Sequence, residues 1–133
     1  MATRSFIAVR NVDGSVNGIY CHHDGYPEGV GATLKEHYAA EDKIRALLAL
    51  GDISVLGAEI GEKHDGRLRS EWTYAYHRDR GDDLDPNMTY GSVVEAVKCA
   101  WKDLGAEYVY IYDPAADTTT KGERWTTFST NAE

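Results

Sequence analysis

The chain has 133 residues, of which 42% are hydrophobic, so we expect one domain spanning residues 1–133 with a buried core. Its net charge of −8 disfavours direct binding to nucleic acid and to anionic membranes, because phosphate groups would be repelled. No apolar run approaches the roughly 18 residues of a membrane-spanning helix, and the first residues lack the apolar core of a signal peptide. We therefore expect a cytoplasmic protein without membrane contacts.

The first predicted element is a β-hairpin made of residues 6–12 and 16–22. Both segments alternate in polarity and are rich in β-forming residues. Asp13 and Gly14 lie between them, and this pair favours a tight turn because such a turn needs a residue that tolerates positive φ. The chain is therefore predicted to begin with two antiparallel strands.

Two helices are predicted after the hairpin and a glycine-rich loop. Residues 33–38 begin the first helix, and residues 41–50 continue as a second helix with an apolar face. Gly51 is well suited to end the second helix, because glycine adopts the left-handed backbone of a helix C-terminus. Residues 52–61 allow either a short helix or an irregular segment against the core.

The second half of the chain contains a strand, a helix and two further strands. Residues 71–77 are predicted as the strand, and Thr89 as the N-cap of a helix that ends at Leu104. Residues 106–113 and 124–129 are predicted as the last two strands. The connecting segments are polar and rich in turn residues, and they comprise residues 62–70, 78–88 and 113–123.

The order of these elements is β-β-α-α-β-α-β-β, which favours the α+β class. We expect a mostly antiparallel sheet of about five strands, with two to three helices packed on one face. A fully parallel sheet would need regular alternation of strands and helices, which this order lacks.

Residues 20–33 form the most distinctive segment, with two adjacent histidines, an Asp-Gly turn and two further glycines before a helix. Loops of this composition fix the backbone and leave polar side chains available to a partner. The backbone N–H groups of a helix start can bind an anion, although this spacing matches neither the P-loop nor the dinucleotide fingerprint. Alternatively, the glycines only allow the chain to turn. The candidate ligand-binding residues are Tyr20, His22, His23, Asp24, Tyr26, Gly29, Gly31 and Thr33.

The histidines of this segment allow two further interpretations. They could bind a metal ion with Asp24, but neighbouring side chains of a continuous strand point to opposite faces, so His22 and His23 would not share an ion. One of them could form the acid–base pair of a small hydrolase with Asp24, although no nucleophile motif accompanies them. Local hydrogen bonding is the simpler interpretation. We therefore expect no metal ion and no cofactor.

Aromatic side chains recur on one face of two predicted strands. An exposed aromatic face would suit a base, a protein partner or a homodimer, whereas a buried face would form a second layer of the core. We favour the buried alternative. The residues concerned are Tyr108, Tyr110 and Tyr112 in one strand, and Trp72, Tyr74 and Tyr76 in the other.

The acidic segment of residues 79–85 is most simply a solvated loop. Alternatively, it could contribute to an acidic surface that mimics the phosphate track of a nucleic acid.

Three stretches carry a family resemblance: Thr3-Arg4-Ser5, the motif YCHHDGYP from Tyr20 to Pro27, and GATLKEHY from Gly31 to Tyr38. Together they resemble the pattern Y-C-H-x-D-G-Y-P followed by G-x-x-L-x-x-H-Y of a family of small, functionally uncharacterised proteins encoded by bacteriophages and prophages. The resemblance covers most of the chain, but this sequence has His23 where members often have an aromatic residue. It implies a role against host machinery, including defence systems, exerted by binding a protein or by sequestering a signalling nucleotide.

The leading hypothesis is therefore a non-catalytic binding protein that engages a host protein or a small anionic ligand through residues 20–33. In this hypothesis Tyr26 and His22 stack and hydrogen-bond, and the backbone from Gly29 to Thr33 meets an anion. One alternative is a small hydrolase that uses His22, His23 and Asp24. Another is an acidic mimic that blocks a nucleic-acid-binding host protein.

Overall fold

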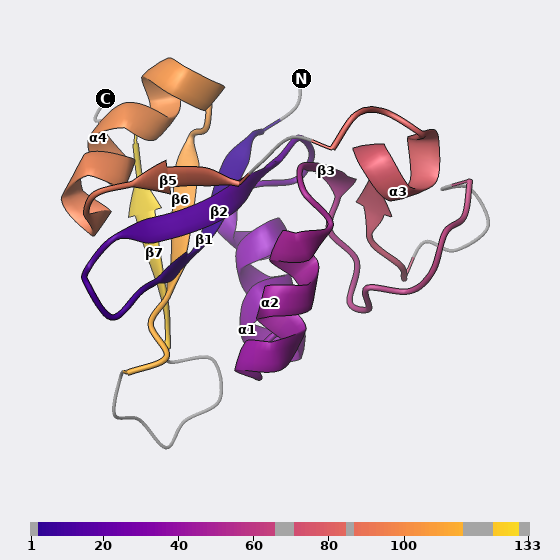
Figure 1. Cartoon of the computed structure of the whole chain (residues 1–133), viewed down its shortest axis with the longest axis horizontal. Coiled ribbons are helices and arrows are strands. Elements are labelled where there is room, and N and C mark those ends of the chain that lie inside the picture. The colour runs from indigo at the N-terminus through magenta and orange to yellow at the C-terminus, as the bar shows by residue number, and fades with distance from the viewer. Residues whose placement is uncertain (1–2, 66–70, 85–86, 116–123, 131–133) are drawn as a thin grey trace.

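The structure is a computed structural model that describes residues 3–65, 71–84, 87–115 and 124–130. It contains a mixed seven-stranded sheet with helices packed against it, which confirms the α+β class (Figure 1). The strands are β1 (Ser5–Arg10), β2 (Val16–Cys21), β3 (Ile53–Val55), β4 (Tyr74–Ala75), β5 (Met88–Tyr90), β6 (Tyr108–Tyr112) and β7 (Trp125–Ser129). The helices are η1 (Pro27–Gly31), a short π-helix, α1 (Ala32–His37), α2 (Glu41–Ala49), α3 (Tyr76–Arg80) and α4 (Val93–Leu104). The loop predictions at residues 66–70, 85–86 and 116–123 lie outside the described residues.

Strand β1 lies inside the sheet, whose order is β4-β3-β2-β1-β6-β7, with β5 also paired to β2. Strands β1 and β2 form the predicted hairpin, and Gly14 in its turn has a φ of 93°. On its other side β1 pairs in parallel with β6, from Ser5 opposite Tyr108 to Val9 opposite Tyr112. Four of the six strand pairings are antiparallel and two are parallel, so the sheet is mostly antiparallel as predicted but mixed.

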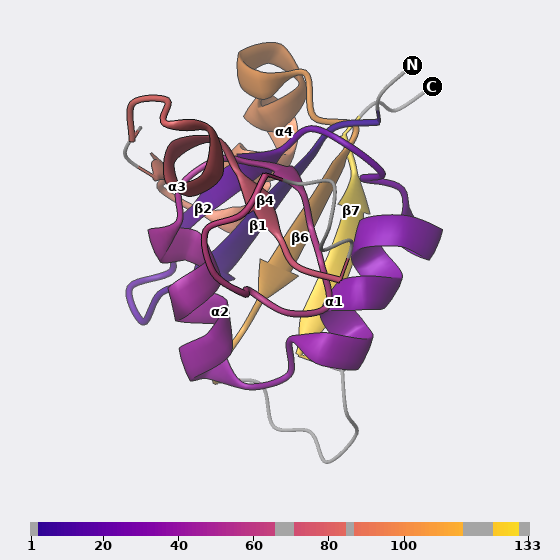
Figure 2. The ribbon, with the colours of Figure 1, turned by 90° about the vertical axis from the view of Figure 1, so that its right-hand side faces the viewer.

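Helices cover both faces of the sheet, whereas the sequence predicted helices on one face (Figure 2). Helices α1 and α2 contribute Leu34, Ile44 and Leu47 to a core cluster that also contains Ile7 and Val9 of β1. Val30 of η1 belongs to the same cluster.

The opposite face of the sheet packs against α4. Phe6 and Ala8 of β1 belong to a second core cluster with Ala96 and Ala100 of that helix. Residues 6–9 are all 0% exposed, because side chains of both orientations are covered. A strand buried on both sides needs apolar residues at consecutive positions, and this segment supplies four of them.

Residues 71–77 form less strand than predicted, because the chain turns into helix α3 at Tyr76. The Asp79 carboxylate accepts a hydrogen bond from the Ala75 N–H at 2.7 Å, which satisfies a donor at the start of this helix. Gly81 ends the helix in the left-handed conformation, with a φ of 79°. Tyr76 is therefore the first residue of a helix and not part of a three-aromatic strand face.

Helix α4 begins later than predicted, with Ser92 rather than Thr89 as its N-cap. The Ser92 hydroxyl accepts a hydrogen bond from the Glu95 N–H at 3.1 Å. Thr89 lies instead in β5, opposite Asn17 of β2. Within the described ranges, every helix is too short or too polar to cross a membrane.

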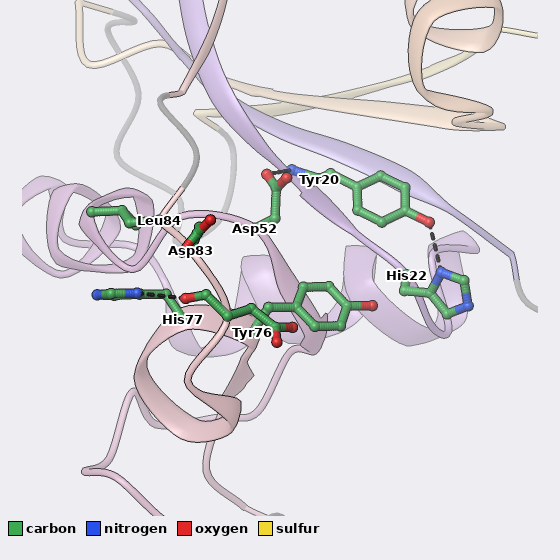
Figure 3. Close-up of a pocket in the computed structure, with 8 residues that line it drawn as sticks. Tyr20, His22, Asp52, Tyr76, His77, Asp83 and Leu84 are labelled. Atoms are coloured by element: carbon green, nitrogen blue, oxygen red, sulfur yellow. Dashed lines mark hydrogen bonds between the residues drawn. The ribbon is translucent and has the colours of Figure 1, made fainter.

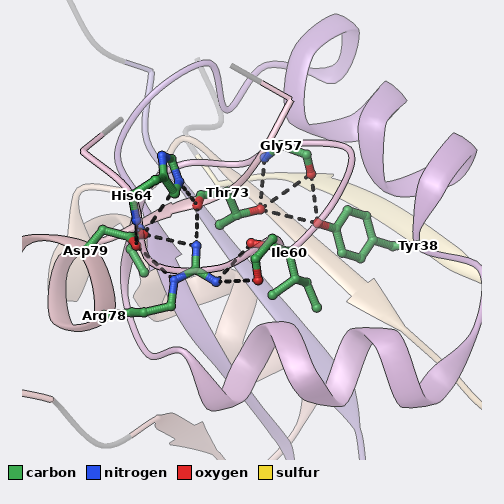
Figure 4. A network of polar contacts seen from close by, with 9 residues as sticks. Tyr38, Gly57, Ile60, His64, Thr73, Arg78 and Asp79 are labelled. Carbon is green, nitrogen blue, oxygen red and sulfur yellow. Dashed lines mark hydrogen bonds and ion pairs between the residues drawn. The ribbon is translucent and has the colours of Figure 1, made fainter. Parts of the chain in front are cut away.

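A buried polar network fastens the segment after β3 to α3 (Figure 4). The Arg78 guanidinium donates to the carbonyls of Ile60, Gly61 and Thr73 at 2.7 to 3.1 Å. It also pairs with the Asp79 carboxylate at 2.9 Å. These bonds hold α3 against Ile60, Gly61 and Thr73.

Asp79 differs from the solvated acidic residue that the sequence predicted. Its carboxylate is 0% exposed and accepts hydrogen bonds from Arg78 and from the N–H groups of His64 and Ala75. Burial alone would raise the pKa of Asp79, but these hydrogen bonds outweigh burial and lower it. Asp82 and Asp83 of the same segment are exposed, in agreement with the prediction.

Candidate functional site

A cavity of about 370 Å³ lies where the end of β2, the start of β3 and helix α3 meet (Figure 3). Its walls come from segments that are far apart in the sequence. The lining residues are Tyr20, His22, Asp52, Tyr76, His77, Asp82, Asp83 and Leu84. Two of them, Tyr20 and His22, are among the site residues predicted from the sequence.

Asp52 connects the two walls of this cavity. It follows Gly51, whose left-handed backbone (φ 79°) ends helix α2. The Asp52 carboxylate accepts a hydrogen bond from the Tyr20 N–H at 3.0 Å, and the Asp52 carbonyl accepts one from the Tyr76 N–H at 3.3 Å. The backbones that carry both tyrosines are therefore fixed to the same residue.

Tyr20 and His22 form a hydrogen-bonded pair on one wall, with 2.6 Å between the phenol oxygen and the imidazole Nδ1. Burial raises the pKa of Tyr20, although Arg4 opposes this shift. Burial, together with the charges of His23 and Arg4, lowers the pKa of His22. Both shifts favour neutral side chains. When the phenol donates to Nδ1, the neutral imidazole carries its proton on Nε2 and can donate a hydrogen bond there.

Helix α3 and the turn after it form the other wall. The Asp82 N–H donates to the Tyr76 carbonyl at 3.1 Å, and the Asp82 carbonyl lies 2.8 Å from Nδ1 of His77. The Arg80 guanidinium lies 5.1 Å from the centre of the Tyr76 ring and 3.8 Å from the Asp82 carboxylate. These contacts fold the turn back onto the helix, so that its acidic residues line the cavity.

The cavity is acidic and aromatic. Three aspartates and two tyrosines line it together with two histidines, and none of its eight lining residues is a lysine or arginine. Carboxylates attract cations and repel phosphate groups, and aromatic ring faces also attract cations. The site is therefore better suited to a cationic or hydrogen-bond-donating ligand than to an anion.

Several of the predicted site residues lie beside the cavity rather than in its wall. The ring of His23 contacts that of His22 edge to face, with centroids 4.5 Å apart. Both rings lie together because β2 ends at Cys21, so the alternation of a continuous strand does not apply to them. Tyr26 donates from its phenol to the Asp24 carboxylate at 3.2 Å, on the exposed surface.

The predicted glycines and Thr33 belong to η1 and α1. The Gly29 N–H donates to the Tyr26 carbonyl at 2.9 Å, and the Val30 N–H donates to the Asp24 carbonyl at 2.8 Å. Gly31 is buried, and a Cβ atom at this position would lie 3.1 Å from the Tyr110 ring. An anion at this helix start would have to compete with the bonds of Gly29 and Val30, while Gly31 permits close packing.

The histidines and carboxylates are not arranged as a metal centre in the part of the chain that the structure describes. No group of three or more His, Cys, Asp or Glu side chains there could hold a metal ion. The described contacts also differ from those of the predicted hydrolase. His22 is bonded to the Tyr20 phenol, whereas Asp24 is bonded to Tyr26.

Two of the three tyrosines of β6, Tyr110 and Tyr112, form the buried aromatic layer that we favoured from the sequence, and Tyr108 is partly buried. Tyr110 and Tyr112 are 1% and 3% exposed, and their phenols donate to the carbonyls of Gly25 and Ala39 at 2.6 and 3.0 Å. Burial raises the pKa of Tyr110. These two tyrosines therefore do not form the exposed face that suggested a homodimer.

The α3 side of the cavity was missed by the sequence analysis. Tyr76 and His77 were placed in a strand, and Asp82 in a generic polar loop. The position of Asp52 directly after the helix-ending Gly51 could have indicated its role, because short polar side chains in turns often bond to backbone groups.

Comparisons of this chain with protein-family models, with curated proteins and with solved structures gave no match.

Proposed function

We propose that this chain is a non-catalytic accessory binding protein that engages a host-cell protein in the cytoplasm through the cavity around Tyr20, His22 and Tyr76. The observation that carries the proposal is the cavity itself, with a volume of about 370 Å³ and walls held by backbone bonds to Asp52. A site fixed in this way loses little conformational entropy when a ligand enters. The host as the source of the partner comes from the resemblance to phage-encoded proteins.

Binding is favoured over hydrolysis by the contacts of the histidines. A general base in a hydrolase is usually oriented by a carboxylate. His22 has a phenol in that position, at 2.6 Å from its Nδ1. A small anionic ligand such as a nucleotide is also less favoured than a protein, because Asp52, Asp82 and Asp83 line the cavity.

The test is a quantitative capture experiment with a matched control. The full chain, Tyr76→Leu and Val94→Ala serve as baits in a bacterial lysate, and captured proteins are compared by mass spectrometry. Val94 is 63% exposed on α4, on the opposite face of the sheet from α1 and α2, so its substitution leaves the cavity intact. We expect a partner that the full chain and Val94→Ala retain and that Tyr76→Leu loses at least tenfold.

The captured partner is then purified and its binding is measured by calorimetry with the same three proteins. Equal affinity for the full chain and Tyr76→Leu would contradict the proposed role of the cavity. Turnover of ester or phosphoester substrates that disappears in His22→Ala would replace the binding function by the hydrolase alternative.

A further inference from the structure

The residues that line the cavity indicate which chemical group would bind there. Its carboxylates come from two directions, with Asp52 at the start of β3 and Asp82 and Asp83 after α3. Asp83 makes no hydrogen bond or ion pair with any residue that the structure describes. A carboxylate in this position is available to a ligand that carries positive charge.

The aromatic walls favour the same kind of ligand. Tyr20 and Tyr76 both line the cavity, and Figure 3 shows the Tyr76 side chain extending toward the side on which the hydrogen-bonded pair of Tyr20 and His22 lies. The face of a tyrosine ring attracts a cation within about 6 Å, and the attraction strengthens when water is excluded. A flat cation can therefore contact a ring and a carboxylate at once.

One guanidinium group of the chain itself is already held by this combination. Arg80 lies 5.1 Å from the centre of the Tyr76 ring and 3.8 Å from the Asp82 carboxylate. Its side chain is 48% exposed, and Arg80 is not among the residues that line the cavity. The contact shows that the ring and the carboxylate at this position accept a guanidinium.

The size of the cavity is sufficient for a long side chain. Its volume of about 370 Å³ lies near the lower end of the roughly 300–1,000 Å³ that small-molecule sites occupy. The acidic lining, rather than the volume, disfavours a nucleotide. Guanidinium also matches the walls better than ammonium, because its planar fork can bond a carboxylate through two N–H groups while it stacks on a ring.

We infer that the cavity binds the guanidinium group of an arginine side chain that the partner protein presents. The inference rests on the proposed function, because it names the group that the binding site recognises. The arginine contacts the tyrosine rings that line the cavity and bonds with the carboxylate of Asp83, while Asp82 stays paired with Arg80.

The experiment titrates the isotope-labelled full chain with Nα-acetyl-arginine methylamide and follows the ring signals of His22 and Tyr76 by NMR. The matched probe is the citrulline analogue, which has nearly the same shape without the charge. The lysine analogue and AMP provide a compact cation and an anion. We expect saturable shifts with the arginine probe at a dissociation constant on the order of 1 mM, as for other ligands of this size.

Two cavity variants and one control locate the binding. Tyr76→Leu weakens arginine binding by roughly tenfold and Asp83→Asn by roughly threefold, with the loss for Asp83→Asn reduced at high salt. Val94→Ala binds as the full chain does. The His22 signals report binding in the Tyr76 variant.

The inference is overturned if citrulline or AMP shifts the same signals as strongly as arginine, or if no probe shifts them. A captured partner that still depends on Tyr76 would then leave the proposed function standing. Conversely, arginine binding at the cavity without any partner that depends on Tyr76 would refute the proposed function and leave the preference for guanidinium in place.

Discussion

Replacement of Arg78 by methionine is the sharpest test of the network that fixes α3. The substitution keeps an unbranched side chain of similar length but removes the guanidinium. Three carbonyls and the Asp79 carboxylate then each lose the hydrogen bonds that they accept from Arg78. Because the Arg78 and Asp79 side chains are 18% and 0% exposed, water replaces few of the lost bonds.

The expected loss of stability follows from the burial of Asp79. Removing one partner of a buried ion pair typically costs about 3–5 kcal/mol. We expect the lower end, about 3 kcal/mol, because the N–H groups of His64 and Ala75 still bond to the carboxylate. An unfolding entropy of about 2.1 cal/mol/K per residue gives about 0.28 kcal/mol/K for 133 residues, so Tm falls by about 11 °C.

The assay is thermal and urea denaturation of the full chain, Arg78→Met and Arg80→Met. Arg80 lies two positions away and its side chain is 48% exposed, so its substitution should cost less than about 1 kcal/mol. A second readout is pH. Because the folded pKa of Asp79 lies below its ordinary value, its contribution is complete above that value and is lost as the pH falls towards the folded pKa. The difference in the free energy of unfolding between the full chain and Arg78→Met should therefore become smaller below about pH 4.

Two results would refute this reasoning. If Arg78→Met and Arg80→Met lose equal stability, the buried bonds of Arg78 have no special weight. If the loss caused by Arg78→Met is independent of pH down to about pH 3, the charge of Asp79 does not contribute to it.

Three further predictions concern other parts of the chain. Tyr38→Phe removes a buried phenol group that donates a hydrogen bond to the Gly57 carbonyl at 2.7 Å (Figure 4). We expect the free energy of unfolding measured in urea to fall by about 1–2 kcal/mol. An unchanged urea midpoint would contradict this expectation. Ser92→Ala removes the N-cap hydroxyl of α4 and should lower the free energy of unfolding by about 1 kcal/mol. Ser92→Thr keeps a hydroxyl at this position and should retain most of the stability. Equal losses in the two variants would show that the hydroxyl does not cause the effect. In an NMR titration, His22 should titrate below its ordinary pKa of 6.5. The free energy of unfolding should decrease as the pH drops below 6.5, because the unfolded chain then binds the proton more readily than the folded chain. A titration midpoint at or above 6.5 would contradict the burial of this imidazole.

The sequence was most informative where the signal is local. The Asp13-Gly14 pair predicted the hairpin of β1 and β2, and Gly14 provides the positive φ in its turn. Gly51 likewise follows the helix that it was predicted to end, Gly105 follows the predicted last residue of α4, and both glycines have positive φ. The α+β class followed from the order of these local elements.

The arrangement of the sheet depends on contacts that no local pattern encodes. The parallel pairing of β1 with β6 brings together residues from the two ends of the chain. One feature of the sequence could have predicted the helices on both faces. Residues 6–9 are consecutive apolar residues, which is typical of a strand covered on both faces and would have predicted helices on both sides.

Only part of the candidate site was predicted, because the rest of it also depends on how the chain folds. Tyr20 and His22 belong to a segment whose composition stands out locally, and both line the cavity. Tyr76 reaches the cavity only because α3 starts at that residue, and this start depends on the Asp79 carboxylate bonding back to Ala75. The balance between strand and helix in residues 71–80 is thus decided by this capping bond and by the bonds from Arg78 to Ile60 and Gly61, which together override the strand propensity.

The position of β1 between β2 and β6 also has a consequence for the order of folding. Its partner β2 follows at once, but Ser5 pairs with Tyr108, which is 103 positions later. Closing so long a loop costs entropy before the contacts that repay it can form, so we expect slow, cooperative folding. During synthesis, one edge of β1 stays unpaired until β6, in the last fifth of the chain, has been made. A fragment that stops before Tyr108 would expose this apolar edge and would be prone to associate with other chains.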